Sequence, residues 1–430
     1  MLERLFGLAE HGTTVRREIL AGLTTFLAMA YIIFVNPLIL ADAGMDRDAV
    51  FVATCLAAAF GTLAMGLYAN FPIALAPGMG INAYFAYAVV GAGHPWQLAL
   101  GIVFVSGCLF MVISLLPIRQ WIINSIPRSL KMAISAGIGF FLVLIALENA
   151  GIVVAHPATL VALAPLSGPM LLALGGFVVI LALDGLKMTG AVILGILLTA
   201  LVGIVLGFSS FQGVFDAPPD PSPVLFQLDI GGALEIGVLS ITFVFFMLAL
   251  FDNAGTMIGV LHQAGMLDAE GRMPRIGRAL VVDSAAIMAG AALGTSTTNC
   301  YIESAAGVKA GGRTGLTAVT VGLLFLLALF LAPLANSIPP YATAPALLYV
   351  GCIMARAMLE LAWDDVTEYA PGVVTALVMP FTYSIANGIG IGFIVYALGK
   401  LLSGRFSQLH PVVVLVAALF VAKFAFLSSG

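Results

Sequence analysis

The stretch that decides the fold of this chain is Gly294-Thr295-Ser296-Thr297-Thr298-Asn299-Cys300-Tyr301-Ile302-Glu303-Ser304-Ala305-Ala306-Gly307. It is rich in glycine, hydroxyl and amide groups, although apolar segments flank it on both sides. Irregular polar backbone occurs at membrane depth only where it is packed in protein or lines a wet cavity. A carboxylate there costs roughly 2.5 kcal/mol or more at a helix centre and marks a functional residue by default. Glu303 is therefore the first candidate functional residue.

The composition is typical of a polytopic α-helical membrane protein. Of the 430 residues, 61% are hydrophobic and 9% are charged, whereas a soluble globular protein carries about 25% charged residues. Apolar windows of about 20 residues, the length that crosses a bilayer as a helix, recur along the chain. The alternating segments of about ten residues that form an outer-membrane barrel are absent. The four cysteines fit neither a disulfide framework nor a metal site.

Lysine and arginine gather in alternate loops between the apolar segments. Arg16 and Arg17 precede the first predicted span, whereas residues 151–168 and 209–235 hold no lysine or arginine. The other basic loops hold Arg119, Arg128 and Lys131, then Lys187, then Arg272, Arg275 and Arg278, and finally Lys400 and Arg405. The positive-inside rule then predicts a cytoplasmic N-terminus in a bacterial inner (plasma) membrane. We expect no cleavable signal peptide, because the first apolar run is long enough to span.

The hydropathy pattern predicts about 14 spans. They are residues 18–40, 49–68, 73–92, 97–117, 130–150, 168–184, 188–208, 233–260, 277–293, 295–309, 314–333, 340–361, 370–401 and 410–428. The count is open on the C-terminal side, because residues 370–401 fit either one broken helix or a hairpin of short ones.

The longest polar interval, residues 209–232, divides the chain into two halves. After a cytoplasmic N-terminus (1–17), the first half covers residues 18–208 and the second covers residues 233–428, with an extracytoplasmic linker between them. Seven spans in each half place the halves in opposite orientations. This is the inverted-repeat plan of many secondary transporters.

The third segment of each half is interrupted. In the first half it reads Ala76-Pro77-Gly78-Met79-Gly80-Ile81-Asn82-Ala83-Tyr84-Phe85, and in the second half it is the run that ends in Glu303. Both open with residues that hold a helix poorly and then become compatible with a helix. Such a matched pair is the best pointer in a sequence to a binding site at the membrane midplane. Each break would offer unpaired N–H groups and the positive end of a helix dipole.

Two acids lie deep in predicted spans without an equally deep lysine or arginine. Asp252 follows more than a dozen uncharged residues, and Thr256 comes four residues later on the same helix face. Glu303 is the second deep acid. Two neighbouring carboxylates cannot both ionise easily in a dry site, so one of them can carry a proton at physiological pH. Asp283, near Arg278, fits a structural ion pair or cap, and its second interpretation is support of the site.

This chemistry suits a neutral, flat heterocycle with N–H donors. An ionised carboxylate accepts two N–H bonds, and Asn82 adds a donor and an acceptor. Aromatic residues near the breaks would stack on a ring, and core packing is the alternative for each of them; they are Tyr84, Phe85, Tyr301, Tyr31 and Phe251. Two acids would repel an anion. We predict no metal site, no cofactor and no nucleic-acid partner.

At these residues the chain resembles the hypoxanthine/guanine (AzgA-like) branch of the xanthine/uracil permease superfamily of nucleobase–cation symporters. The segments that carry the resemblance are residues 24–37, residues 76–85, Leu250-Phe251-Asp252 with Gly255-Thr256, and residues 301–307 followed by residues 311–319. The match covers both halves in order. The last two motifs are long and specific.

The resemblance implies a seven-plus-seven inverted repeat with a core domain (spans 1–4 and 8–11) and a gate domain (spans 5–7 and 12–14), and a homodimer through the gate domains. The family's substrate-binding acids fall on Asp252 and Glu303. Its span-3 asparagine falls on Asn82, and the polar position after the span-8 acid falls on Thr256. Backbone groups from Gly80 to Asn82, with Ile81 between them, and at Ile302 would meet the substrate, beside the ring of Phe85.

The chain departs from the family pattern at two places that flank the site. Asn253 stands where a hydroxyl residue usually follows the span-8 acid. Thr298, Asn299 and Cys300 stand where the family usually has Val-Thr-Thr. Thr298 and Asn299 are therefore expected to support the site, and the departures leave the purine preference open.

The sequence therefore predicts an importer of purine nucleobases, namely guanine or hypoxanthine, with adenine and xanthine as further candidates. Coupling to H⁺ is favoured over Na⁺, and the core is expected to move against the gate like an elevator, surrounded by lipid. The alternative is an anion transporter of the same fold, similar to sulfate permeases. An enzyme is disfavoured because no HExxH, GxSxG or paired catalytic Asp motif is present. A channel would need a continuous polar pore.

Overall fold

The computed structural model describes residues 2–116, 127–235, 238–264, 266 and 275–426. Within α12 and α20, it does not describe the side chains at positions 239, 240, 250–255, 258, 259, 262, 263 and 426. Among the described residues, nine helical stretches are long and apolar enough to cross a membrane, and three shorter apolar helices accompany them. The predicted polytopic helical fold is confirmed, whereas the count of 14 spans stays a prediction.

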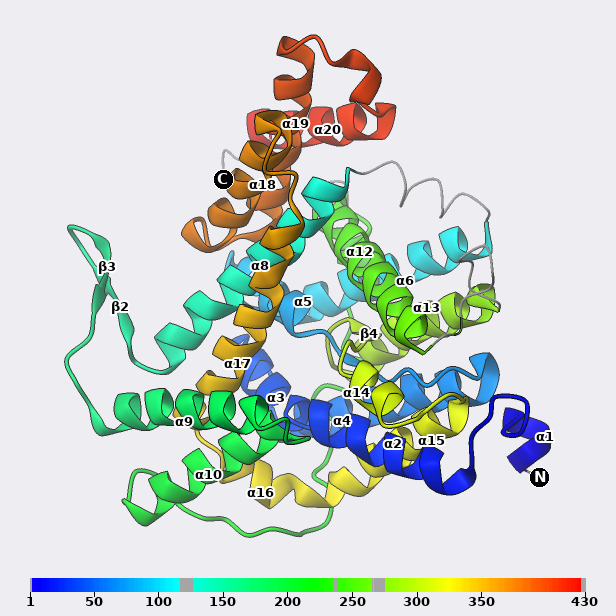
Figure 1. Ribbon diagram of the computed structural model, residues 1–430. Coiled ribbons are helices and arrows are strands. Elements are labelled where there is room, and N and C mark those ends of the chain that lie inside the picture. Colours follow the sequence, from blue (N-terminus) through cyan, green and yellow to red (C-terminus); the bar gives the residue numbers. More distant parts are fainter. Residues whose placement is uncertain (1, 117–126, 236–237, 265, 267–274, 427–430) are drawn as a thin grey trace.

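The first half of the chain is mostly helical (Figure 1). Its helices are α1 (Leu2–Phe6), α2 (Val15–Met29), α3 (Ile32–Asp42), α4 (Arg47–Ala64), the π-helix η1 (Met65–Ala69), α5 (Met79–Ala83), the π-helix η2 (Tyr84–Val90), α6 (Trp96–Leu115), α8 (Arg128–Asn149), α9 (Gly168–Gly185) and α10 (Ala191–Val205). Side-chain caps begin several of them. The hydroxyl of Thr14 accepts the N–H of Arg17 at the start of α2, and the Asp46 carboxylate accepts the N–H of Ala49 at the start of α4.

The second half is built in the same way. Its helices are α11 (Ile230–Ala233), α12 (Leu239–Gln263), α13 (Ile276–Leu293), α14 (Ser304–Lys309), α15 (Gly315–Ala328), the 3₁₀-helix η3 (Leu329–Leu331), α16 (Ala332–Asn336), α17 (Pro340–Ala355), the 3₁₀-helix η4 (Arg356–Glu360), α18 (Val366–Phe381), α19 (Ile385–Leu402), the 3₁₀-helix η5 (Phe406–Gln408) and α20 (Pro411–Phe426). In the first half, between α8 and α9, two short strands form a hairpin that projects from the body (Figure 1). They are β2 (Val153–His156) and β3 (Leu160–Leu163).

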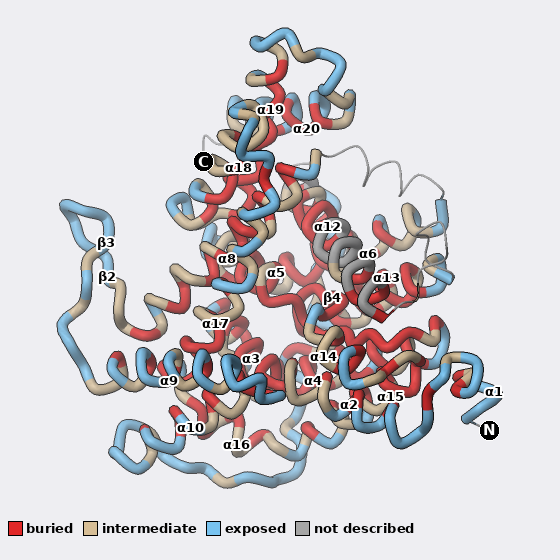
Figure 2. Tube along the Cα trace, viewed as in Figure 1, coloured by how far each residue is buried: buried red, intermediate tan, exposed pale blue. Residues whose placement is uncertain are grey.

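The two interrupted segments meet at the centre of the molecule. Strand β1 (Leu75–Pro77) pairs antiparallel with strand β4 (Thr298–Cys300), so that Ala76 lies opposite Asn299. The backbone N–H of Gly78 donates to the carbonyl of Thr297 at 2.9 Å, which extends the pairing by one bond. Each strand leads into a short helix, α5 after β1 and α14 after β4. Figure 2 shows that the chain around this crossing is largely buried.

The ambiguous region at residues 370–401 forms a helical hairpin. Helices α18 and α19 pack side by side. Lys400 of α19 is fully buried, and its Nζ lies 2.6 Å from Glu368 Oε1 of α18. The same amine donates to Gln408 Oε1 at 2.8 Å. A buried charge is tolerated only where it is paired and hydrogen-bonded, so these contacts fix the two helices together.

Glu18, near the start of α2, is fully buried and caps the beginning of α15. Its carboxylate accepts the backbone N–H groups of Arg313 (2.9 Å), Thr314 (3.2 Å) and Thr317 (3.3 Å), and the hydroxyl of Thr317 (2.6 Å). The first N–H groups of a helix lack partners within the helix, and the helix dipole favours a negative charge there. Glu18 therefore joins two helices that lie nearly 300 positions apart.

We expect Glu18→Ala to lower the free energy of unfolding by about 3 kcal/mol, because several buried donors lose their acceptor. Glu18→Gln keeps an acceptor oxygen and should cost only about 1 kcal/mol. The measurement is thermal unfolding of the purified protein in detergent. Glu10→Gln, at an exposed position close to the N-terminus, is the control, and a Glu18→Ala protein as stable as this control would contradict the capping role.

Candidate functional site

A cavity of about 780 Å³ opens beside the β1–β4 crossing. Its size lies within the range of about 300–1,000 Å³ that is usual for small-molecule sites. One wall comes from α8 and α17, and the other comes from the two breaks with α12 and α14. Seven of the candidate residues predicted from the sequence line the cavity: Gly80, Thr256, Asn299, Tyr301, Ile302, Glu303 and Tyr31.

Glu303 lies at the start of α14 with its side chain partly exposed to the cavity. The hydroxyl of Tyr31 donates a hydrogen bond of 2.8 Å to Glu303 Oε1. Tyr31 lies at the break between α2 and α3. An irregular point in the first predicted span therefore positions Glu303, which lies in the tenth predicted span. A hydrogen bond to a carboxylate is shorter and stronger than one between neutral groups. The Glu303 carboxylate is therefore held in one orientation toward the cavity.

Asn82 belongs to a buried polar network rather than to the cavity wall. Its amide N–H donates to Asn36 Oδ1, and its amide oxygen accepts the hydroxyl of Ser296. Asn36 in turn donates to Thr54 Oγ1 at 2.7 Å and to Thr295 Oγ1 at 3.0 Å. The network ties both breaks to α3 and α4. Its direct contact with a substrate stays a prediction, and in the structure Asn82 holds the breaks together.

The aromatic residues fall into two groups. Tyr31 and Tyr301 line the cavity, and the hydroxyl of Tyr301 donates to the Pro77 carbonyl at 2.6 Å, across the crossing. Phe85 is fully buried, and Tyr84 packs on Phe245 with ring centroids 5.0 Å apart. Among the described rings of this set, Tyr31 and Tyr301 are thus the ones that line the cavity, and Ile81 is buried and is not part of its lining.

The second predicted acid, Asp252, falls in α12 but its side chain lies outside the described residues, as do those of Phe251 and Asn253. Leu248 and Thr256, one helical turn before and after position 252, line the cavity. Helix α12 packs against β4 and α14. The face of α12 that carries Leu248 and Thr256 is therefore turned toward the crossing.

Three residues were expected to support the site. Asp283 of α13 is fully buried, and its Oδ1 accepts a weak hydrogen bond from the Cys300 thiol with S and O 3.7 Å apart. Asn299 lines the cavity, whereas Thr298 is buried in β4 beside it. All three therefore contact or belong to the strand that leads to Glu303.

Two tyrosines and two carboxylates form a cluster away from the cavity. Tyr87 donates to Asp42 at 2.6 Å, and Tyr383 donates to Glu148 at 2.5 Å. The two tyrosine rings meet edge to face with centroids 6.0 Å apart. Glu148 lies near the C-terminal end of α8, and Lys131, which lines the cavity, lies near its N-terminal end. The two positions are roughly 25 Å apart along the helix at 1.5 Å per residue.

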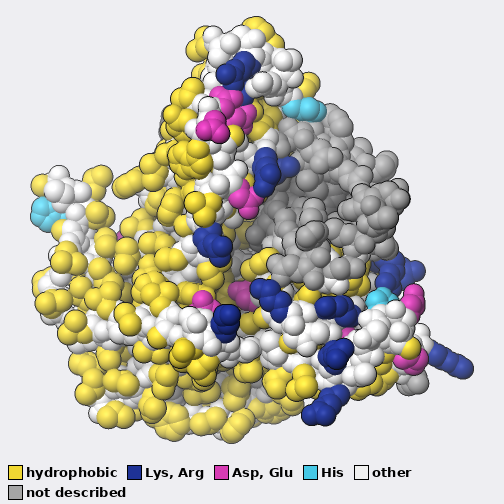
Figure 3. Space-filling view, viewed as in Figure 1, with side chains coloured by type: hydrophobic (Ala, Val, Ile, Leu, Met, Phe, Trp, Pro, Cys, Tyr) yellow, Lys and Arg dark blue, Asp and Glu magenta, His cyan; other side chains and the backbone are white. Residues whose placement is uncertain are grey.

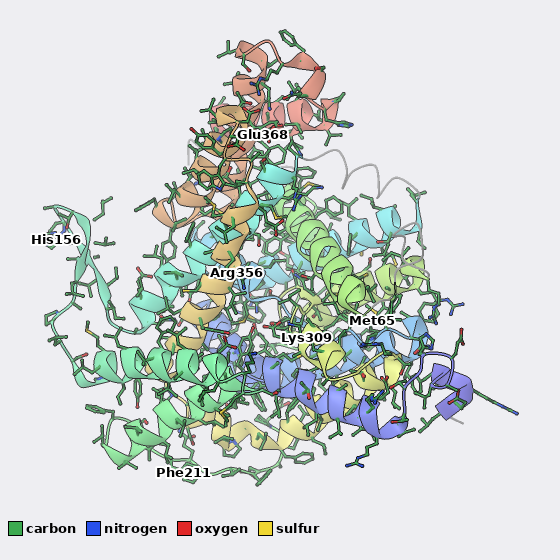
Figure 4. All side chains as sticks on the ribbon, viewed as in Figure 1. Met65, His156, Phe211, Lys309, Arg356 and Glu368 are labelled. Carbon is green, nitrogen blue, oxygen red and sulfur yellow. The ribbon has the colours of Figure 1, made fainter. Side chains whose placement is uncertain are left out.

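Some site residues carry only a weak signal in the sequence. Asn36 is a lone amide inside an apolar run, which marks a buried polar contact but not its partner. Lys131 and Lys309 also line the cavity, although the sequence marked Lys131 only as a charge between two spans and gave Lys309 no role. Figure 4 labels Lys309 at the end of α14.

The chain matches known permeases over its whole length. Residues 16–391 match a family model described as Permease family, Xan_ur_permease. "Adenine permease AdeP" of Escherichia coli (strain K12) is 48% identical over 431 residues, which covers 100% of this chain and 97% of that protein. "Guanine/hypoxanthine permease PbuG" of Bacillus subtilis (strain 168) is 43% identical over 440 residues, covering 99% of this chain and 100% of that protein.

Solved structures share the fold at low sequence identity. The transmembrane domain of the cyanobacterial bicarbonate transporter BicA superposes with a TM-score of 0.63. It is 16% identical, and the match covers 86% of this chain and 96% of that one.

Helix α5, which follows β1 of the crossing, contacts α8 tightly at Gly80. A Cβ at this position would overlap Cγ2 of Ile138, a stiff β-branched side chain. We therefore expect Gly80→Ala to lower both thermal stability and substrate uptake. Removing the opposing methyl in Gly80→Ala/Ile138→Ala should restore part of both.

The control is Gly175→Ala on α9, where an added Cβ meets no atom within 4 Å. Uptake and unfolding temperature are measured for all variants. If Gly80→Ala matched Gly175→Ala, or if the double variant gave no recovery, the close contact between the crossing and α8 would be refuted.

Proposed function

We propose that this chain, which belongs to the xanthine/uracil permease family, imports a purine nucleobase together with a proton. The family and the relatives make it a nucleobase permease in the membrane and not an enzyme. The relatives are named for adenine and for guanine and hypoxanthine, so these purines are the first substrates to test.

The observation that carries the proposal is the position of Glu303. The acid stands in a cavity beside two crossed chain breaks, and Tyr31 holds one of its oxygens at 2.8 Å. A carboxylate accepts N–H bonds through both oxygens, and purines present N–H groups at the edge of a flat ring. Tyr301 and Tyr31 supply aromatic surface for that ring. Gly80 and Ile302 also line the cavity, and we propose that their backbone groups meet the ring.

The proton role follows from the cost of a charge at this depth. An ionised carboxylate within a membrane protein is expensive, and protonation removes the charge during passage. We assign this step to Glu303, and the pairing with the purine N–H edge to Asp252. Leu248 and Thr256, one helical turn before and after position 252, line the cavity, and this supports the second assignment. A sodium ion is the less favoured partner.

The cavity and the tyrosine cluster support alternating access. The cavity lies near Lys131 and Lys309, and the positive-inside rule assigns this end to the cytoplasm. At the other end of α8, Tyr383 bonds to Glu148 and its ring contacts that of Tyr87, and we propose that this contact closes the opposite side. We propose that the core segments slide past α8 and α17 as one body, opening the tyrosine cluster while closing the cavity. A homodimer through the gate helices would hold those helices still in the bilayer.

The rival function is transport of an anion on the same fold, for which BicA is the structural example. A small anion bound in place of the base, directly at Glu303, would meet its carboxylate at close range and be repelled. A neutral heterocycle with N–H donors gains hydrogen bonds from the same group. The site thus favours the nucleobase.

We expect Glu303→Gln to lower proton-driven purine uptake by roughly 30-fold or more and to abolish its pH dependence, because the amide accepts fewer bonds and cannot exchange a proton. Uptake of labelled adenine, guanine and hypoxanthine is measured in cells from pH 5 to 8. Glu235→Gln, at an exposed position, is the control. Normal uptake with an unchanged pH profile in Glu303→Gln would refute the assigned role.

The hydrogen bond from Tyr31 gives a second prediction. Tyr31→Phe should reduce uptake about tenfold, since a hydrogen bond to a charged group contributes about 1.5–3 kcal/mol. In the Glu303→Gln background the same change should add little, because the two residues act as one unit. Uptake is compared across the two single variants and the double variant. Additive losses would show that Tyr31 acts independently of Glu303.

A further inference from the structure

The cavity is larger than a free purine base requires, and two lysines line it. Lys131 of α8 and Lys309 of α14 line it from opposite walls. Lys131 is half-buried and Lys309 is exposed. Within the part of the chain that the structure describes, neither amine has a carboxylate within salt-bridge distance. Figure 3 shows Lys and Arg side chains gathered on this face, next to its central hollow.

The positions of the two lysines in their helices can be compared with that of Glu303, the proposed base-binding acid. Lys309 follows Glu303 by six residues on α14, which is about 9 Å along the helix axis at 1.5 Å per residue. Lys131 lies in the first turn of α8, where the helix dipole also favours negative charge. A ligand that places an N–H edge at Glu303 can therefore extend a phosphate toward the lysines. A free nucleobase has no group to put there.

On the basis of the proposed function, we propose that this cytoplasm-facing cavity also binds a purine nucleoside 5′-monophosphate. The base lies at Glu303, the ribose spans the cavity, and the phosphate lies between Lys131 and Lys309. Two ammonium groups give a phosphate monoester charge-assisted hydrogen bonds from both sides. The ligand is too large for the base site to close over it, so it holds the permease open to the cytoplasm and slows import.

This assignment also indicates which class of reaction consumes the base after the permease has imported it. The class of reaction that would consume an imported base is phosphoribosyl transfer: a ring nitrogen attacks the anomeric carbon of a phosphoribosyl diphosphate, diphosphate and the ring proton leave, and the product is such a monophosphate. Its accumulation would then reduce entry of the base. The lysines provide the recognition, because the phosphate is the group that distinguishes this product from the base.

The test is competition binding on the purified full-length protein in detergent. Labelled adenine or guanine is displaced by AMP, GMP, adenosine or inorganic phosphate. We expect the monophosphates to compete at least tenfold better than adenosine, and 0.5 M salt to reduce this preference by screening. Inorganic phosphate alone should compete weakly. Monophosphates no better than adenosine would overturn the proposal.

Variants assign the effect to the lysines. Lys131→Gln/Lys309→Gln should weaken monophosphate competition by tenfold or more and change base binding by less than twofold. Lys131→Arg/Lys309→Arg should keep it, and Lys187→Gln, which removes an exposed charge elsewhere, is the matched control. Equal monophosphate competition in the glutamine variant and in this control would overturn the assignment.

Two arms separate the alternatives. In nanodiscs with and without anionic lipid, the monophosphate must still compete; competition by the lipid alone would make the lysines a headgroup site and contradict the proposal. If the base binds but no monophosphate competes, the inference fails and the proposed function stands. If no purine base binds at all, the proposed function itself fails, and the inference with it.

Discussion

The pairing of two three-residue strands, β1 and β4, is the constraint on which the rest of this structure depends. A membrane-embedded chain must satisfy every backbone polar group internally, and an interrupted helix leaves such groups open. Here each break supplies partners for the other, from Leu75 opposite Cys300 to the bond between Gly78 and Thr297. The pairing brings the starts of α5 and α14 to the same place. Glu303, at the second of these starts, thereby reaches a cavity instead of the lipid.

Hydrogen bonds among several of the polar residues around the crossing help to hold it in place. Asn36, Asn82 and Ser296 form a continuous network beneath the strands. Glu18 caps α15 from α2, and Lys400 pairs with Glu368 in the α18–α19 hairpin. A fully bonded buried network specifies a single arrangement, whereas a partly bonded one costs several kcal/mol. The few polar residues of a chain that is 61% hydrophobic therefore define where its segments meet.

The matched breaks and Glu303 were predictable from the sequence, because glycine, proline and hydroxyl residues are conspicuous inside apolar runs. The register of β1 on β4 was not, since no periodicity links segments more than 200 positions apart. For the same reason the hydrogen bonds of Asn82 to Asn36 and Ser296 were not predictable, and its contact with a ligand stays a prediction. Tyr31 was only a weak aromatic candidate, and its bond to Glu303 depends on the fold. The hairpin at residues 370–401 could not be recognised from the sequence alone, because it depends on the contact between the buried Lys400 and Glu368.

The most direct test of the account is an experimental structure of the protein with adenine or guanine bound. The account predicts flat density between the β1–β4 crossing and the wall formed by α8 and α17. The N–H edge of the base should lie within hydrogen-bond distance of the Glu303 carboxylate. A base bound elsewhere in the molecule, with Glu303 still contacting Tyr31 and not the ligand, would contradict it.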